Sequence, residues 1–537
     1  MRVDSPAARG SQIVLLTLAT GQFLMTLDSS VMNVSIATVA EDVGTTISGI
    51  QGAITAYTLV MAMLMITGGK VGAIIGRKRA FSIGCVIYGC GSLTTSLAGS
   101  LPVLLIGWSF LEGVGAALIM PAIVALVAGN FGIEERPKAY GLVAAAGASA
   151  VAIGPLIGGV ATTYFSWRWV FAGEVLIVIV ILLLGRRIED AVPDVKPRID
   201  VVGAVLSAVG LGLAVYGVLR SSEWGWVQPK AGGTSWLGLS PTIWLIVAGL
   251  VVIWLFSLWE ERVEQRGGEP LIARRLLRVP QLIGGLIMFF FQYLVQAGVF
   301  FVVPLFLSVA LGLSALATGV RLLPLSATLL LAAIGVPRAF PTASPRRVVR
   351  IGLFCLLAGT VVLLGGLDAD AGPEIVFVPM LLMGLGMGAL ASQLGAVTVS
   401  AVPDDDSPEV GGLQNTATNL GASLGTALAG SLMIAALTSS FLANIEQSSA
   451  IPDSVKQQAK VELVSGVPFV SDETLQQELE QAGASDQATA DAIDANADAR
   501  LDGLRAALAI LAVLAVVAML FTGRVPEHQP AAATPSR

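Results

Sequence analysis

Long apolar stretches recur along almost the whole chain and are separated by short polar segments. A helix that crosses about 30 Å of hydrocarbon needs roughly 20 apolar residues. The pattern predicts about fourteen membrane-spanning helices, at residues 12–37, 49–73, 80–98, 101–128, 138–161, 167–186, 200–219, 241–261, 280–309, 313–335, 349–366, 374–400, 410–438 and 503–523. The expected fold class is therefore an all-α integral membrane protein.

Lysine and arginine gather in every second loop of this layout. They are Lys70, Arg77, Lys78 and Arg79; Arg136 and Lys138; Arg186, Arg187, Lys196 and Arg198; Arg262, Arg266, Arg274, Arg275 and Arg278; and Arg338, Arg346, Arg347 and Arg350. Cytoplasmic loops carry the excess of basic residues, so we expect both termini on the cytoplasmic side. The acidic loop 401–409 is the exception, but acidic residues contribute little to orientation.

Composition agrees with a membrane protein and excludes several function classes. Of 537 residues, 55% are hydrophobic and 13% are charged, against about 25% charged in soluble domains. The three cysteines lie in apolar segments and the one histidine, His528, lies in the C-terminal tail, so we expect no disulfide, metal site or cofactor. No nucleophile–base set or phosphate loop occurs, so we expect neither an enzyme nor direct ATP coupling, and no nucleic-acid partner. Abundant Ala, Gly, Val and Arg suggest a bacterial cytoplasmic membrane, and we expect a monomer.

One long polar insertion, residues 440–502, is acidic and is expected outside the cell. Ser471, followed by Asp472 and Glu473, is typical of a capped helix start. Both a small helical cap and a solvated linker fit this composition.

Three carboxylates interrupt the predicted spans: Asp28 in the first, Glu112 in the fourth and Glu174 in the sixth. A charge inside a bilayer is costly and usually has a partner or a function. Such an acid can take up a proton in a closed cavity and release it when the cavity opens to water. We therefore predict that these residues couple proton flow to transport. The alternative is a protonated acid that is hydrogen-bonded to a neighbouring helix.

Other polar side chains within the spans are candidates for a substrate cavity: Gln22, Asn33, Tyr57, Gln292, Gln296, Gln393, Gln414, Asn415 and Asn419. Gln292 and Gln296 are one helical turn apart and so share a face. Hydrogen bonding between helices is the alternative role for all of these residues.

The fifth span carries small residues at one-turn spacing and a proline: Gly141, Ala150, Gly154, Pro155, Gly158 and Gly159. This pattern predicts close helix packing and a bend. It resembles the antiporter signature of the major facilitator superfamily, with Ala150 where a glycine is usual. The runs 27–34, 55–57, 166–169 and 411–416 are similar to those of the fourteen-span drug:proton antiporters of that superfamily.

The resemblance covers nearly the whole chain and implies two six-helix bundles with two inserted helices. It places the N-terminal bundle at 1–190, the inserted pair at 191–270, and the C-terminal bundle, with the acidic extracellular loop, at 271–537. It further implies an exporter of amphipathic or cationic small molecules, driven by protons through alternating access. A flippase or exporter of a native lipid or lipid-linked metabolite is the second transport hypothesis. A membrane sensor without net transport is the hypothesis from another class.

Two segments depart from the family pattern. The loop after the second span resembles the cytoplasmic gating motif at Gly69, Gly76, Arg77 and Lys78, but Ala73 and Ile74 replace its usual Asp and Arg. It is also explained as an ordinary basic inner loop. Ser109 occupies the place of an arginine that is common in drug antiporters. The usual arginine–carboxylate relay is therefore in doubt, which favours Asp28 and Glu112 as proton carriers.

Overall fold

The computed structural model describes residues 6–131, 136–190, 198–230, 234–368, 371–402, 407–447, 469–481 and 486–528. In these ranges the chain is helical except for its connections and one isolated bridge between Trp236 and Leu239. The predicted loop residues Lys196, Asp404, Asp405 and Asp406 lie outside them.

The N-terminal bundle contains six long helices: α1 (Pro6–Val34), α3 (Ile47–Ile75), α4 (Arg77–Ser96), α6 (Gly113–Asn130), α7 (Arg136–Tyr164) and α8 (Arg168–Leu184). Its short elements are α2 (Ile36–Asp42), α5 (Leu101–Leu104), the π-helix η1 (Leu105–Glu112) and η2 (Gly185–Arg187). Helix α1 packs against α7 and α8, and α4 packs against α6, α8 and η1.

The C-terminal bundle also contains six long helices: α11 (Pro280–Leu305), α12 (Ala315–Ala339), α13 (Pro345–Gly366), α14 (Phe377–Val399), α15 (Ser407–Gln447) and α18 (Asp486–Phe521). Its short elements are η3 (Leu276–Arg278), η4 (Phe306–Ala310), η5 (Pro373–Val376), α17 (Asp472–Gln481) and η8 (Thr522–Arg524). Helix α11 packs on α15, and α14 packs on α12 and α13.

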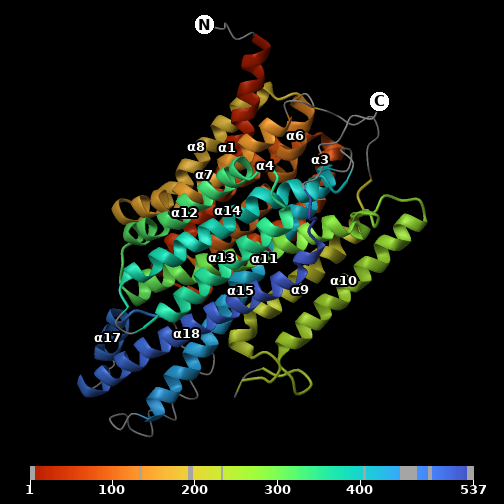
Figure 1. Cartoon of the computed structure of the whole chain (residues 1–537). Helices are drawn as coiled ribbons and strands as arrows, with labels where there is room; N and C mark the ends of the chain where they lie inside the picture. Colours follow the sequence, from red (N-terminus) through yellow and green to blue (C-terminus); the bar gives the residue numbers. More distant parts are fainter. Residues whose placement is uncertain are drawn as a thin grey trace.

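Two further helices, α9 (Val201–Trp224) and α10 (Pro241–Gln265), form an antiparallel pair between the bundles in sequence and beside them in space (Figure 1). Helix α9 touches α3 of one bundle and α15 of the other. Helix α10 packs mainly on α9, and only 11% of its apolar window is buried. The inserted pair therefore lies at the side, with α10 outermost.

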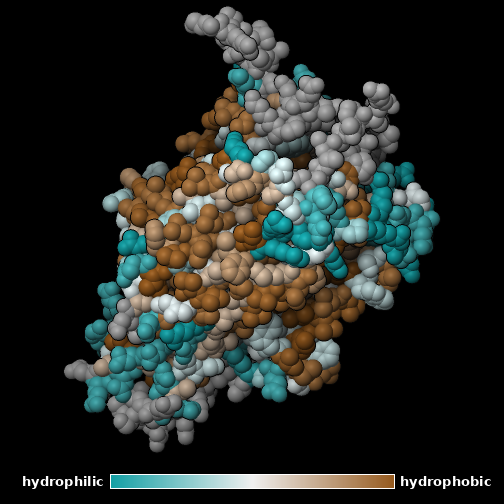
Figure 2. All heavy atoms as spheres, viewed as in Figure 1, coloured by the Kyte–Doolittle hydropathy of each residue, from teal (hydrophilic) through white to brown (hydrophobic). Residues whose placement is uncertain are grey.

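Twelve helices among the described residues are long and apolar enough to cross a membrane. The two parts of α7, Ala139–Val151 and Ile153–Tyr164, are bent by 40° and would together make a thirteenth. Helix α4 does not qualify, because its 20 residues begin with three basic side chains and include several polar ones. The all-helical membrane class is confirmed, whereas a count of fourteen stays a prediction. An apolar surface covers the middle of the molecule, with polar residues gathered toward its ends (Figure 2).

The end of the molecule that carries Lys70, Arg77, Arg187, Arg274 and Arg346 is called the basic face below. Helix α1 begins and α18 ends on this face, whereas α17 lies at the opposite end (Figure 1). The two bundles meet along α3 with α15 and along α7 with α12.

The acidic insertion is largely helical where it is described. Helix α15 continues to Gln447 and α18 begins at Asp486, so both helices extend beyond the predicted spans 410–438 and 503–523 into the acidic insertion. The backbone N–H of Thr474 donates to the Ser471 hydroxyl at 3.2 Å, which caps α17 as expected. Arg500 of α18, 3% exposed, pairs with Asp472 at 2.6 Å. These described residues resemble a helical cap more than a linker.

Candidate functional site

The three membrane-embedded carboxylates come together in the centre of the N-terminal bundle. Asp28, Glu112 and Glu174 come from α1, η1 and α8, and each offers one oxygen within 4.8 Å of the others. Their side chains are 0%, 0% and 1% exposed. Three residues far apart in sequence therefore form one buried acidic cluster.

Asp28 is held by an aromatic pair. The indole Nε1–H of Trp108 donates to both Asp28 oxygens, at 2.8 and 2.9 Å. The Trp108 ring is stacked on Tyr57 of α3, with centroids 5.1 Å apart and an interplanar angle of 11°. Tyr57 itself is 1% exposed. Tyr57 is thus part of the acidic cluster's surroundings.

Helix α4 supplies hydroxyl donors to the two glutamates. Thr95 Oγ1 donates to Glu112 Oε1 at 3.1 Å. Ser92 Oγ and Tyr88 OH donate to Glu174 Oε2 at 3.1 and 3.3 Å. Glu112 Oε2 and Glu174 Oε1 are both buried and have no hydrogen-bond partner among the described residues. Each glutamate therefore keeps one oxygen available for a proton or a ligand.

The approach of α4 to Glu112 requires a glycine. A Cβ atom at Gly91 would lie 2.6 Å from Glu112 Cγ, which is closer than real contacts allow. The absence of a side chain at Gly91 lets the carboxylate sit against the α4 backbone.

The π-helix η1 presents Trp108, Ser109 and Glu112 to the bundle interior, where all three are buried. Short π-helical segments are frequent at functional sites, because they re-aim side chains within a helix. Ser109 Oγ donates to the carbonyl of Ala53 at 2.8 Å. The position expected to carry an arginine therefore joins η1 to α3 and brings no positive charge to the cluster.

Charge repulsion and burial both favour protonation of the acidic cluster. No ion pair between described residues includes Asp28, Glu112 or Glu174. Two unit charges 4.8 Å apart at an effective dielectric of 20 repel by about 3.5 kcal/mol, and burial adds a desolvation cost. Shared protons relieve both terms. A hard cation with oxygen ligands at about 2.4 Å would also fit this spacing.

The predicted cavity amides Gln292, Gln393 and Gln414 form hydrogen bonds with residues of their own C-terminal bundle, and these bonds do not involve the acidic cluster. Gln292 is 3% exposed, and its Nε2 approaches the carbonyl of Met387 in α14 at 3.5 Å, while its Oε1 has no partner. Gln393, 5% exposed, bonds Ser392. Gln414 accepts from Thr398 at 3.2 Å, which is a helix-to-helix bond.

The remaining predicted cavity residues are half-buried. Asn33 Nδ2 donates to the Ser29 carbonyl at 2.7 Å, and Asn419 Nδ2 donates to the Asn415 carbonyl at 2.8 Å, both within their own helices. Gln22 lies beside α7, since a Cβ at Gly147 would be 3.4 Å from its Nε2. Gln296 is half-buried one turn from Gln292. Their role as cavity residues stays a prediction.

The glycines of the antiporter-like pattern serve two interfaces. A Cβ at Gly154 would lie 2.4 Å from Ser30 Cβ, and one at Gly158 would lie 3.0 Å from Val31 Cα, both in α1. A Cβ at Gly159 would instead lie 2.8 Å from the Ala315 carbonyl of α12. Gly141 has nothing within 4 Å. The glycines therefore let α7 pack closely against α1 of its own bundle and against α12 of the other bundle.

Pro155 links the bundles in a way that depends on its missing N–H. A proline cannot donate to the carbonyl four residues earlier, which here belongs to Val151. The Ser326 hydroxyl of α12 donates to that carbonyl at 3.2 Å. The bend in α7 is thus coupled to a hydrogen bond across the interface between bundles.

The hydrogen bonds that join described residues of the two bundles lie in the half remote from the basic face or near the middle. Gln51 Nε2 donates to the carbonyls of Thr426 and Ala427 at 3.2 and 3.3 Å. Ser423 Oγ donates to the Thr55 carbonyl at 3.0 Å, and the Leu316 N–H donates to Thr163 Oγ1 at 3.0 Å. Direct hydrogen bonds between described residues of the two bundles thus lie away from the basic face, whereas on that face α3 and α15 meet through the linker described below.

The gate-like loop is fastened within its own bundle. Gly76 has φ +99°, and a Cβ there would lie 2.4 Å from Asp190 Oδ2. Asp190 accepts from the Lys78 backbone N–H at 3.1 Å, and Lys78 Nζ donates to the carbonyls of Arg186 and Ile188. Arg77 is half-buried, and Gly69 packs by Pro121. Asp190 thus supplies an acidic partner to this loop, where Ala73 and Ile74 cannot.

The linker after the inserted pair joins three parts of the basic face. Lys70 of α3 donates to the Pro270 carbonyl. The Ile272 and Ala273 N–H groups donate to Glu260 of α10 and Glu409 of α15, at 2.8 and 2.9 Å. Leu276 of this linker packs in one apolar cluster with Val410 and Leu413 of α15, and Ile66 of α3 borders that cluster.

Sequence reasoning missed the groups that hold the cluster: Trp108, Tyr88, Ser92 and Thr95. A signal was present, because 88, 92 and 95 follow helical spacing and Trp108 is one turn before Glu112. Gln51, which fastens the bundles, gave no signal beyond being a polar residue in a span.

Solved structures share this fold. The chain matches, over 97% of its length, 98% of a bacterial homologue of the human lysosomal transporter Spinster in an inward-facing, unoccupied conformation, with TM-score 0.59 and 15% identity. It matches 97% of the proton:xylose symporter XylE with TM-score 0.54 and 13% identity.

Sequence comparisons give a family. Residues 18–426 match the profile of the Major Facilitator Superfamily. The chain is 31% identical to a probable actinorhodin transporter of Streptomyces coelicolor, over 78% of this chain and 72% of that protein. It is 29% identical to the tetracenomycin C resistance and export protein of Streptomyces glaucescens, over 78% and 75%, and 24% identical to multidrug resistance protein Stp of Mycobacterium tuberculosis, over 85% and 82%. The chain therefore belongs to the Major Facilitator Superfamily, as a multi-pass transporter of the cell membrane and not an enzyme.

Proposed function

We propose that this transporter exports amphipathic small molecules, including cationic ones, in exchange for protons. The acidic cluster of Asp28, Glu112 and Glu174 is the observation that carries the proposal, because three buried carboxylates without a basic partner need protons to remain buried. Relatives named for the export of actinorhodin and tetracenomycin C support the direction and the substrate class.

The transport cycle follows from the two interfaces. We take the basic face as cytoplasmic, since basic residues are retained on that side. The hydrogen bonds of Gln51, Ser423 and Leu316 then close the outer side. Release of these contacts, and rocking of the bundles along α3–α15 and α7–α12, would open the cluster to outside protons.

Closure of the inner side would use the basic-face linker. Lys70, Ile66 and Glu409 bring α3 and α15 to the same short segment around Pro270–Leu276. This segment offers the inner gate a contact between bundles that does not need the Asp and Arg missing at Ala73 and Ile74. Gly69, Gly76, Arg77 and Lys78 keep the loop shape that presents Lys70.

The amides suit a role in substrate binding. Gln292 Oε1 is buried without a partner, and Gln296 lies one turn away on the same helix. Neutral acceptors of this kind can orient a polar group of an amphipathic ligand. Gln22, Asn33, Tyr57, Gln393, Gln414, Asn415 and Asn419 complete the proposed set of substrate-cavity residues.

The proposal is tested in inside-out vesicles that are acidified by respiration and supplied with ethidium or puromycin as probes. Accumulation of a probe that collapses with a protonophore, and proton release that each added probe triggers, are the expected results. Asp28→Asn and Glu112→Gln should each lower both by roughly 100-fold. Unchanged proton movement in both variants would refute the assignment, and accumulation driven by a sodium gradient alone would replace protons with a hard cation.

A further inference from the structure

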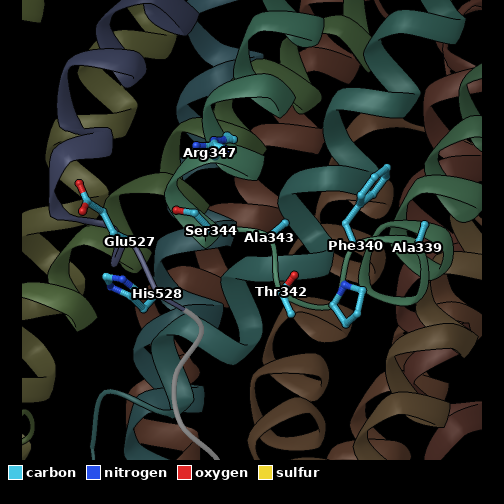
Figure 3. A pocket seen from close by; sticks show the side chains of 9 residues that line it. Ala339, Phe340, Thr342, Ala343, Ser344, Arg347, Glu527 and His528 are labelled. Carbon is cyan, nitrogen blue, oxygen red and sulfur yellow. The ribbon is translucent and has the colours of Figure 1, made fainter.

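A cleft on the basic face lies between the α12–α13 connection and the segment that follows α18. Its volume is about 490 Å³. Phe340, Thr342, Ser344 and Arg347 line one side, and Glu527 and His528 line the other. Figure 3 shows the two hydroxyl residues between the tail residues and the Phe340 ring.

Two arginines of α13 that do not line the cleft hold the segment after α18 that forms its other side. Arg346 Nε and Nη2 donate to the carbonyls of Val525 and Gly523 at 2.7 and 2.8 Å, and its guanidinium pairs with Glu527. Arg350 Nε donates to Thr522 Oγ1 at 3.0 Å. These bonds hold the tail in place and neutralise the one carboxylate that lines the cleft.

Arg347 is left with its charge uncompensated. It is exposed and takes part in no hydrogen bond or ion pair among the described residues, and neither does the Ser344 hydroxyl or the His528 imidazole. A guanidinium with hydroxyl and imidazole groups beside it is a set of donors suited to the oxygens of a phosphate.

The surface next to the cleft is apolar along the membrane. Ile351 and Phe354 follow Arg347 by one and two turns of α13, on the same face, and are 55% and 62% exposed. Leu331 of α12 is 68% exposed and Phe340, at the cleft itself, is 63% exposed. A cationic end followed by an apolar stripe matches a phosphate headgroup with its acyl chain.

We propose that this cleft binds the headgroup of an anionic phospholipid from the cytoplasmic leaflet, with Arg347 on the phosphate and an acyl chain along Ile351 and Phe354. The assignment of leaflet rests on the orientation proposed above, but the site does not depend on proton coupling. Anionic lipids are favoured over zwitterionic ones, because Glu527 is already paired and the remaining charge is positive.

Native mass spectrometry of the purified full chain tests the site directly. Phosphatidylglycerol should bind in preference to phosphatidylcholine, and Arg347→Gln should weaken its binding about tenfold or more, as expected for loss of charged hydrogen bonds. Arg187→Gln is the matched control, since Arg187 is exposed on the same face away from the cleft, and it should change binding by less than about twofold.

Two further variants keep the test independent of folding. His528→Ala alters only the tail and should weaken phosphatidylglycerol by a smaller factor than Arg347→Gln. Ile351→Asn should weaken the lipid while leaving the binding of inorganic phosphate unchanged. Equal binding of both lipids, equal loss in Arg187→Gln, or displacement of the lipid by millimolar inorganic phosphate would each overturn the proposal. If the wild-type protein bound phosphatidylglycerol as expected but did not export the probe in exchange for protons, only the proposed function would fail.

Discussion

The two six-helix bundles have similar layouts but different centres. The N-terminal bundle buries three carboxylates around Trp108 and Tyr57. The C-terminal bundle buries Gln292 and Gln393, and its helix α14 also buries Met380, Met383 and Met387, which are 0% exposed. Its buried arginine, Arg500, lies at the far end of α18 and is paired with Asp472.

This difference suggests that the two bundles have different roles in transport. Carboxylates can change charge, whereas amides offer the same donors and acceptors in every state. Methionine side chains are flexible and adapt to ligands of varied shape. We infer that the N-terminal bundle carries the proton chemistry and that the C-terminal bundle contributes mainly to the fit of the substrate.

The strongest way to break the contrast is to neutralise the acidic cluster. Glu112→Gln keeps the size of the side chain and its bond to Thr95, but cannot exchange a proton. Substrate-triggered proton release in vesicles should fall roughly 100-fold, the lower range for loss of a proton-transfer group.

Glu374→Gln is the control for this change, because Glu374 is an exposed carboxylate of the other bundle. It should leave proton release within about twofold of wild type. Similar losses in both variants would mean that the cluster has no special role.

The second prediction concerns the α7–α12 interface. In the proposed cycle, this interface couples protonation of the acidic cluster to movement of the C-terminal bundle. Gly159→Val would press a side chain onto Ala315 and Leu316 of α12, and such overpacking costs about 1–3 kcal/mol. Probe export should fall about tenfold while the thermal midpoint drops by only a few degrees.

Gly141→Val is matched to it, because Gly141 lies in the same helix with nothing within 4 Å. Export should be unchanged there. If Gly141→Val were as damaging as Gly159→Val, loss of helix flexibility would explain the effect and contact with α12 would not.

The difference between the bundles was only half visible in the sequence. Asp28, Glu112 and Glu174 stood out because charge is rare inside spans, and hydropathy fixed the helical class. Trp108 and Tyr88 did not stand out, since aromatic residues are common in spans, and only three-dimensional packing shows which of them meets a carboxylate.

Helix ends were predicted less well for a similar reason. Residues 440–447 and 486–502 are polar and lie outside the predicted spans, yet they continue helices α15 and α18. Contacts such as Arg500 with Asp472, which are remote in sequence, stabilise helix beyond the apolar stretch. Local hydropathy carries no information about them.

A third prediction sharpens the role of the C-terminal centre. Gln292→Leu removes the amide near the Met387 carbonyl and the unpartnered oxygen. Loss of one hydrogen bond to a ligand is worth about 1 kcal/mol, so the KM for a transported probe should rise about fivefold. The ratio of protons to probe should stay the same. A changed ratio would show that the C-terminal bundle also carries proton chemistry.

The smallest effect is expected where the two bundles share the basic-face linker. Lys70→Met removes the bond to the Pro270 carbonyl while keeping the apolar stem beside Ile66. Because Lys70 is only half-buried, the loss should be about 0.5–1 kcal/mol. Hydrogen–deuterium exchange at the Ile272 and Ala273 amides should then speed up about two- to fivefold. Arg79→Gln, which removes an exposed charge at the start of α4, should not change it. Equal acceleration by both variants would show that the net charge of this region holds the linker. The specific bond from Lys70 to Pro270 would then not account for the proposed inner gate.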